Sequence, residues 1–253
     1  MSIRTVLGFA LSAFLVVGGI GYVAAMPRPA PLVGVPVAQE APLGASVTVV
    51  PKQVGAVATD GELGGSQPTI DQQWILSVGS RAAVPARALQ AYAAATNTID
   101  TARPECQLGW NTLAAIGMVE SGHGTHDGAS IAADGQLAGV ILGPVLDGKD
   151  FDKVVDTDRG VLDGDTQWDR AVGPFQFIPS TWAAYGVDAS GDGVADPNQI
   201  DDAALTAALY LCTAGQDLST DAGWTAAVRA YNNNDDYVAA VRAQSNDYAQ
   251  LAG

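Results

Sequence analysis

From residue 71 onward, apolar positions recur at the three- and four-residue spacing of helices, and no run alternates as a strand would. Helices are predicted over residues 84–95, 201–212, 224–231 and 237–243. The segments between them are long. We therefore expect residues 71–253 to form one mainly α domain with long loops.

One further predicted helix ends in an acidic residue, Glu120. Leu113, Ile116 and Gly117 lie seven, four and three residues before it and share its face. A carboxyl group in apolar surroundings loses solvation, so its neutral form is favoured and its pKa rises. Gly122 follows where a left-handed helix cap would fit. The pattern indicates a general acid at a helix end, and the alternative is a solvated glutamate at a frayed end.

The amino-terminal segment has the features of an export signal. Arg4 precedes an apolar run over residues 5–25, which as a helix would be about 30 Å long and could cross a bilayer. Residues 1–25 are therefore expected to be either a cleaved signal peptide or a single-pass membrane anchor. Residues 26–70 are rich in Pro, Gly, Ala and Val and are predicted to form a disordered linker. We expect an exported protein of the cell envelope, periplasmic or extracellular.

Charge and cysteine content narrow the picture further. The net charge is −15, which argues against binding to nucleic-acid phosphates. The two cysteines, Cys106 and Cys212, are expected to form one disulfide because export exposes them to oxidising surroundings. Two buried free thiols are the alternative. We also expect a monomer.

Three short segments occur in a fixed order along the domain. They are Glu120-Ser, Gly173-Pro-Phe-Gln-Phe and Ala230-Tyr-Asn. Over about residues 72–248, this set resembles the lytic transglycosylases of bacterial cell walls. Within them it is most similar to the membrane-bound lytic murein transglycosylase B type in its actinobacterial form. The resemblance implies a lysozyme-like domain that cleaves the MurNAc–GlcNAc β-1,4 bond of peptidoglycan strands and leaves 1,6-anhydro-MurNAc ends.

The resemblance also implies roles for single residues. Glu120 would be the one catalytic acid, later acting as a base, and Ser121 is interpreted as a helix-end residue. Substrate-binding roles fall on Gln176, Tyr231, Asn232 and Tyr237. Amide groups of this kind can bond an N-acetyl group and tyrosine rings offer flat faces to sugars. For Tyr237 a place in the core is an equal alternative.

The chain departs from the family pattern just before the glutamine segment, where a small hydroxyl residue is usual. Residues 167–170 read Gln-Trp-Asp-Arg, and Thr166 is left unassigned. Asp169 could serve as a second carboxylate, which would favour a lysozyme-like muramidase that uses water. Pairing of Asp169 with Arg170 or another base is the preferred interpretation. A third alternative is a non-catalytic, calcium-dependent wall-binding module.

The long segment 125–169 holds ten aspartates and separates Glu120 from the glutamine segment. It is expected to flank the substrate cleft, the alternative being a solvated loop. His123 lies just before the start of this segment, and His126 is its second residue. The two histidines lack the spacing of a zinc site.

A second constellation suggests a structural calcium ion without an organic cofactor. Oxygen-bearing side chains at positions one, three and five, with Gly193 at position six, match the opening of a calcium loop. The expected ligands are Asp188, Ser190, Asp192, the Val194 carbonyl and Asp202. Asp202 comes from the resemblance, since the twelfth loop residue, Gln199, is a poor ligand. The alternative is an Asx turn that leads into the next helix.

Overall fold

The computed structural model describes residues 70–149 and 151–252. The predicted signal or anchor, residues 1–25, and all of the predicted linker except Ile70 lie outside the described residues. Within the described part, no helix is both long enough and apolar enough to span a membrane.

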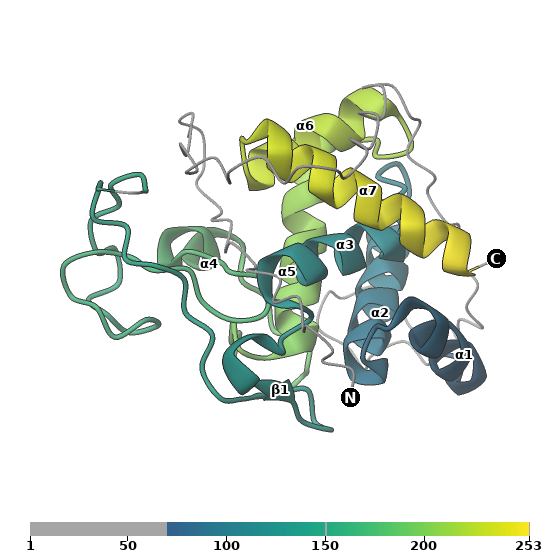
Figure 1. The fold of residues 1–253 in the computed structure, drawn as a ribbon, viewed down its shortest axis with the longest axis horizontal. Coiled ribbons are helices and arrows are strands. Elements are labelled where there is room, and N and C mark those ends of the chain that lie inside the picture. Colours follow the sequence, from purple (N-terminus) through teal and green to yellow (C-terminus); the bar gives the residue numbers. More distant parts are fainter. Residues whose placement is uncertain (1–69, 150, 253) are drawn as a thin grey trace, which may run out of the picture.

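The described part of the chain is mainly helical, as the sequence predicts (Figure 1). Its helices are α1 (Gln72–Ala82), α2 (Ala86–Ala102), α3 (Trp110–Ser121), α4 (Pro179–Tyr185), α5 (Ile200–Gly215), α6 (Asp221–Tyr231) and α7 (Asp235–Ala252). A single 3₁₀ turn, His126–Gly128, precedes two short strands, β1 (Ser130–Ile131) and β2 (Leu137–Ala138). These strands pair antiparallel, with Ser130 opposite Ala138.

Helix α5 runs through the centre of the domain (Figure 1). It packs against α2 and α6, and α3 packs against α7. Half of α5 is alanine and leucine, and twelve of its sixteen residues are buried. A helix that is apolar on all sides is stable only when other helices surround it. The core around α5 therefore sets the positions of α3, α6 and α7.

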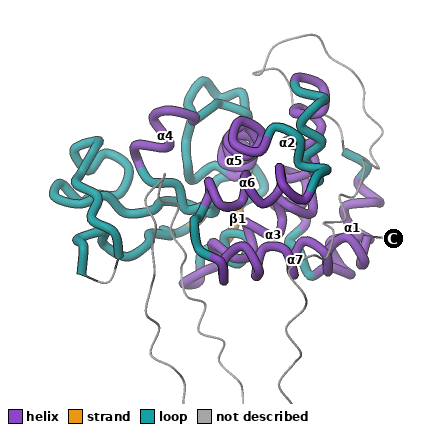
Figure 2. Tube along the Cα trace, turned by 90° about the horizontal axis from the view of Figure 1, so that it is seen from above, coloured by secondary structure: helices purple, strands orange, loops and turns teal. Residues whose placement is uncertain are grey.

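Residues 125–178 lie mostly at the end of the molecule where α4 also lies (Figures 1 and 2). They are built as turns and single bridges, such as Leu142 opposite Val172 and Val155 opposite Trp168. Leu146, Ala171 and Ile178 form a small buried cluster there. Many of the aspartates accept backbone N–H groups, which fixes tight turns. The segment is thus an ordered structure with its own small core, and not a solvated loop.

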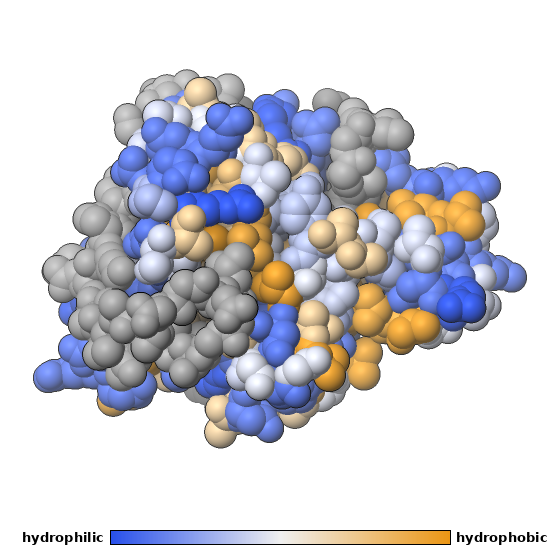
Figure 3. Space-filling view, turned by 180° about the vertical axis from the view of Figure 1, so that it is seen from behind, coloured by the Kyte–Doolittle hydropathy of each residue, from blue (hydrophilic) through white to orange (hydrophobic). Residues whose placement is uncertain are grey.

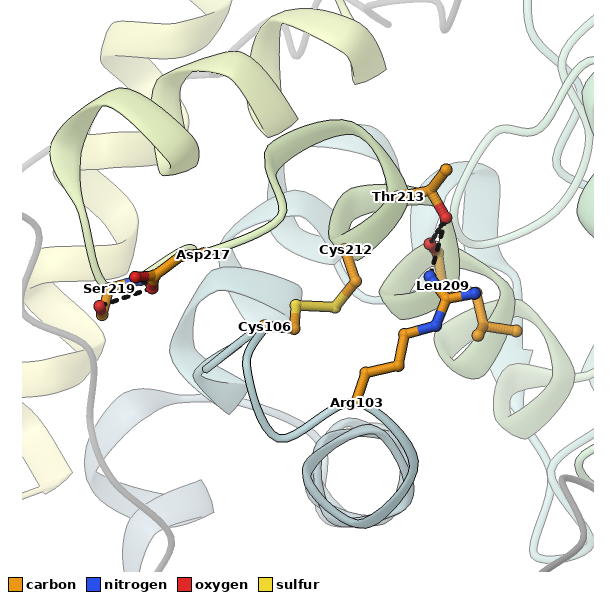
Figure 4. The surroundings of a disulfide bond; sticks show 7 residues. All are labelled: Arg103, Cys106, Leu209, Cys212, Thr213, Asp217 and Ser219. Carbon is orange, nitrogen blue, oxygen red and sulfur yellow. Dashed lines mark hydrogen bonds between the residues drawn. A yellow bond between two sulfur atoms is a disulfide. The ribbon is translucent and has the colours of Figure 1, made fainter.

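A disulfide joins the loop before α3 to α5, as the cysteine count predicts (Figure 4). The Cα atoms of Cys106 and Cys212 are 5.4 Å apart. Nearby, the Leu218 amide donates to the Cys106 carbonyl at 2.8 Å. The bridge ties the start of the α3 region to the central helix.

One face of the molecule shows a band of apolar residues between hydrophilic ones (Figure 3). Large apolar side chains that are exposed in the described part come from several segments: Leu76, Val140, Val155, Val161, Val194 and Leu251. Exposed apolar residues of this kind are usual on folded domains. We therefore assign no partner to them.

Candidate active site

Helix α3 carries Glu120 in its last turn. Gly122 ends the helix in the left-handed conformation, with φ 59° and ψ 43°. The Gly122 amide donates to Met118 and the His123 amide donates to Gly117, at 2.9 and 2.8 Å. These two bonds make the helix end that the position of Gly122 predicts. The cap fixes the backbone two residues after the acid.

The carboxyl group of Glu120 is buried, with only 3% of the residue exposed. The Tyr237 hydroxyl donates to Glu120 Oε1 at 2.6 Å. Oε2 has no hydrogen-bond partner among the described residues. Burial raises the pKa of Glu120 well above its ordinary value, and the weaker effect of the Tyr237 bond lowers it. Burial therefore shifts Glu120 towards its protonated form, with Oε1 accepting the Tyr237 hydroxyl and Oε2 left as the oxygen that could carry a transferable proton.

Two tyrosines surround the acid from α6 and α7. Both Tyr231 and Tyr237 are fully buried. The Tyr231 hydroxyl donates to the Phe175 carbonyl at 2.8 Å. Burial, and then the nearby charge of Glu120, raise the pKa of both tyrosines. The structure thus places Tyr237 in the core, and its hydroxyl on the acid, a contact that the sequence analysis did not foresee.

The glutamine segment forms a tight turn next to α3. Gln176 has φ 50° and is almost fully buried. Its amide nitrogen donates to the Gly173 carbonyl at 2.8 Å and to the Ile141 carbonyl at 3.4 Å. The Gly173 amide also donates to Ile141, at 2.9 Å. Residues 139–143 of the long insertion therefore line the glutamine segment.

Ser121 connects the end of α3, directly after Glu120, to the glutamine segment. The helix-end interpretation missed this role. Its hydroxyl donates to the Pro174 carbonyl at 2.6 Å and accepts the Gly124 amide at 2.8 Å. The sequence signal for it is its place directly after Glu120. Asn232, which the resemblance marks as a substrate ligand, follows α6 and is 6% exposed. Substrate binding by Gln176, Tyr231, Asn232 and Tyr237 stays a prediction.

The expected pairing of Asp169 with Arg170 is wrong. Asp169 is buried, and its two oxygens accept the Thr157 amide at 2.9 Å and the Thr157 hydroxyl at 2.7 Å. Arg170 instead donates from Nε to the Gly143 carbonyl at 2.7 Å. Asp169 holds a turn, because a buried carboxylate needs donors and the Thr157 backbone supplies one within the same loop. In the described part of the chain no contact joins Asp169 to Glu120.

The structure also groups three acids that the sequence analysis did not identify as a set. One carboxylate oxygen from each of Asp156, Asp158 and Asp169 lies within 4.8 Å of the other two. Their proximity comes from the folding of the insertion, which brings residue 169 back to the turn at 156–158.

The predicted calcium loop has the turn geometry of its opening residues. Asp188 accepts the Gly191 amide at 2.7 Å and the Gly193 amide at 2.8 Å. Asp192 accepts the Val194 amide at 2.8 Å. Gly193 has φ 93°, which favours glycine at that position. These hydrogen bonds are also typical of an Asx turn, the alternative that the sequence analysis left open.

Asp202 closes this loop from the first turn of α5. Its oxygens accept the amides of Ala189 and Ser190 at 2.8 Å and of Asp196 at 3.0 Å. Burial raises the pKa of Asp202, the three amide bonds lower it, and the charge of Asp188 raises it further. The side chains of this loop offer oxygen atoms, the ligands that Ca²⁺ prefers, and the oxygens of Asp188 and Asp202 also accept backbone amides, so calcium binding stays a prediction.

Comparison with known proteins adds one match. Residues 156–252 match the model of the family described as the transglycosylase SLT domain. The matched part holds Gln176, Tyr231, Asn232 and Tyr237, and begins after Glu120. No curated protein and no solved structure matches the chain. The match covers less than half of the chain and supports a lytic transglycosylase family, without singling out one type within it.

The Tyr237 bond to the acid predicts a specific effect of Tyr237→Phe. Because the bond favours the ionised carboxylate, its loss should raise the pKa of Glu120 further and move the alkaline limb of the activity profile to higher pH. Looser orientation of the acid should lower kcat up to about tenfold, the value of one hydrogen bond. Activity measured against pH checks this.

Tyr210→Phe is the matched control, since the Tyr210 hydroxyl donates to the Ala230 carbonyl and not to the acid. An alkaline limb that is the same in Tyr237→Phe as in the wild type would contradict the predicted role of the bond.

Proposed function

We propose that the protein is an exported lytic transglycosylase of the B type in its actinobacterial form, which cleaves the MurNAc–GlcNAc β-1,4 bond of peptidoglycan in cell-wall remodelling. The observation that carries the proposal is the buried carboxyl of Glu120, which Tyr237 orients through one oxygen and whose other oxygen has no hydrogen-bond partner in the described part of the chain. The match to the transglycosylase SLT domain supports the substrate class.

The chemistry needs one group that gives and then takes a proton. Oε2 of Glu120 donates its proton to the glycosidic oxygen as the bond to C1 of MurNAc breaks. The resulting carboxylate then removes the proton from the C6 hydroxyl, whose oxygen bonds to C1 and gives the 1,6-anhydro ring. Most glycosidases employ a second carboxylate for the second step. Among the described residues no second carboxylate contacts Glu120, and the proposed intramolecular attack by the C6 hydroxyl requires none.

Digestion of purified peptidoglycan, followed by mass spectrometry of the released muropeptides, tests this function. Products with anhydro-MurNAc ends are expected. Reducing MurNAc ends would instead favour the muramidase alternative, and binding without release would favour a wall-binding module. The site gives no observation that favours either alternative.

Export and membrane attachment through residues 5–25 belong to the same proposal. They follow from Arg4 and the apolar run after it. Fractionation of cells that produce the full chain, with the mass of the mature protein, separates a cleaved signal from an anchor. Recovery of the protein in the cytoplasmic fraction with its full mass would contradict export.

The polar groups around the acid are proposed to bind the glycan. Gln176 and Asn232 carry amides suited to an N-acetyl group. Tyr231 is proposed to support them by holding the Phe175 carbonyl. We expect a monomer with glycan strands as its partner.

We further propose that Ca²⁺ binds to the loop from Asp188 to Asp202 and stabilises the fold without taking part in the reaction. Asp188, Ser190, Asp192 and Asp202 would hold it with side-chain oxygens and Val194 with its carbonyl. A ligand bound only by the folded state raises stability by mass action, by about 2.7 kcal/mol at a hundred times its Kd.

Calcium is therefore expected to raise the melting temperature relative to EDTA. Asp192→Ala should remove that difference, because Asp192 is exposed and its loss leaves the core intact. Asp217→Ala is a matched control, an aspartate in another exposed turn. Equal melting curves of the wild type in Ca²⁺ and EDTA would remove the calcium assignment.

A further inference from the structure

His123 is a buried imidazole three residues after the proposed acid, and the reaction does not use it. It is 2% exposed, and its Nδ1 lies 3.1 Å from the Tyr92 hydroxyl. Its Nε2 lies 2.9 Å from the Tyr248 hydroxyl. A neutral imidazole has one N–H donor and one acceptor nitrogen, so both hydrogen bonds can form at once. The three side chains make a continuous buried chain from α2 to α7.

The backbone of His123 is held in an unfavourable conformation. Its φ is 62°, in the left-handed region that costs free energy in residues other than glycine. Such a conformation persists where surrounding contacts offset it. Here the offsetting contacts are the two tyrosine hydroxyls and the His123 amide, which closes the end of α3 on Gly117. The side chain and the helix cap therefore form one unit.

This unit lies against the face of α3 that carries Glu120. A Cβ atom at Gly117, on that face, would collide with the Tyr92 hydroxyl. The Tyr92 ring also packs edge-on against Phe175 of the glutamine segment, with 5.7 Å between ring centroids. Tyr92 thus touches the acid's helix, the imidazole and the glutamine segment.

We propose that His123 is a positioning residue for Glu120. Its neutral imidazole, hydrogen-bonded to Tyr92 and Tyr248, locks the end of α3 against α2 and α7, so that Glu120 stays in place against Tyr237. The inference rests on the proposed function, because it deepens the account of the same acid. Burial supports it, since it lowers the pKa of His123 to about 4 and keeps the ring neutral at physiological pH.

His123→Phe tests the proposal, because it keeps an aromatic ring at the position, one atom larger, and removes both nitrogens. Loosening α3 should let water reach Glu120, which lowers the pKa of the acid towards its ordinary value. The alkaline limb of kcat should then move to lower pH, and kcat should fall about tenfold to a hundredfold with little change in KM. Of the groups that face Glu120, Tyr231 and Tyr237 have pKa values raised by burial, so neither titrates in this range.

The matched control is His126→Phe, a half-exposed histidine in the next turn and the only other one in the chain. It should leave the limb, kcat and KM unchanged. A merely structural role of His123 would lower the melting temperature and the active fraction without moving the limb, and that result overturns the proposal. If His123→Phe fails to fold, Tyr92→Phe and Tyr248→Phe each remove one hydroxyl and should move the limb in the same direction.

The titration of the Glu120 carboxyl by carbon NMR provides a readout that needs no turnover. It should shift to lower pH in His123→Phe and stay in place in His126→Phe. A wild type that releases no anhydro ends would contradict the proposed function. An unshifted carboxyl in a folded His123→Phe protein would contradict positioning by His123.

Discussion

Glu120→Gln is expected to remove nearly all turnover while the protein still folds and binds glycan. Glutamine keeps the size of the side chain, and its carbonyl oxygen can still accept the Tyr237 hydroxyl. Its amide group then stands where Oε2 held the transferable proton. General acids contribute about 10²–10⁴-fold to such reactions, so we expect a loss of at least about 10²–10³ in kcat. Release of muropeptides by equal amounts of folded protein measures it.

Asp169→Asn is the matched control, because Asp169 is the other buried acid that the sequence brings into question. Its oxygens accept hydrogen bonds from Thr157 and make no contact with Glu120, so the change should cost far less activity. If both variants are inactive and the wild type releases reducing ends, the enzyme is a hydrolase with two carboxylates. Full activity of Glu120→Gln would refute the assignment of the site.

Glu120→Gln is also expected to make the fold more stable than the wild type as the pH rises. The pKa of Glu120 is raised in the folded protein, so the folded state binds its proton more tightly than the unfolded state does. Stability from this group is complete below the unfolded pKa and is lost as the pH rises through the folded pKa. Glutamine has no such titration. The melting temperature of Glu120→Gln should exceed that of the wild type by a margin that grows above about pH 4.3, the ordinary value for glutamate.

The second large effect is expected from removing the disulfide. Cys106 and Cys212 are 106 residues apart in the sequence, so the bridge restricts the unfolded chain strongly. Chain entropy puts its contribution at about 4–5 kcal/mol at most, and removal typically costs about 2–5 kcal/mol. The double variant Cys106→Ser, Cys212→Ser should therefore unfold at a markedly lower denaturant concentration. Denaturation curves of the two proteins measure the difference.

Wild-type protein treated with reductant should behave like the double variant, which separates loss of the bridge from the effect of the serines. The control is the double variant with reductant, which should not change further. Unreduced wild-type protein in which both thiols react with an alkylating agent would contradict the bridge.

Much of the helical architecture could be predicted because burial leaves a periodic trace in the sequence. Helix α5 is an example, since its alanines and leucines recur at helical spacing. The second half of α7 could not be predicted in this way, because it is polar. Ser245 there accepts the Asn111 amide at 2.8 Å, and Tyr248 bonds to His123. Contacts with α3, made only after folding, extend the helix beyond what its own pattern supports.

In the candidate site, too, local sequence identifies some residues, whereas other contacts form only on folding. Glu120 was identifiable from neighbours within two helical turns, which is local information. Its bond to Tyr237 spans 117 residues, and the bond of Ser121 to Pro174 spans 53. No spacing rule covers such distances. The role of Asp169 was misjudged because adjacency to Arg170 suggested an ion pair, whereas the folded loop offered Thr157.

The distant position of Tyr237 bears on the order in which the site is completed during synthesis. Both cysteines, and with them the whole stretch that contains Glu120, leave the ribosome before α7 does. On the proposed export route, the two cysteines can therefore reach oxidising surroundings and form their disulfide while the acid still lacks the hydroxyl that orients it. Helix α7, which is made after both of these parts, supplies that hydroxyl, so the acid gains its orienting contact only after α7 has been made.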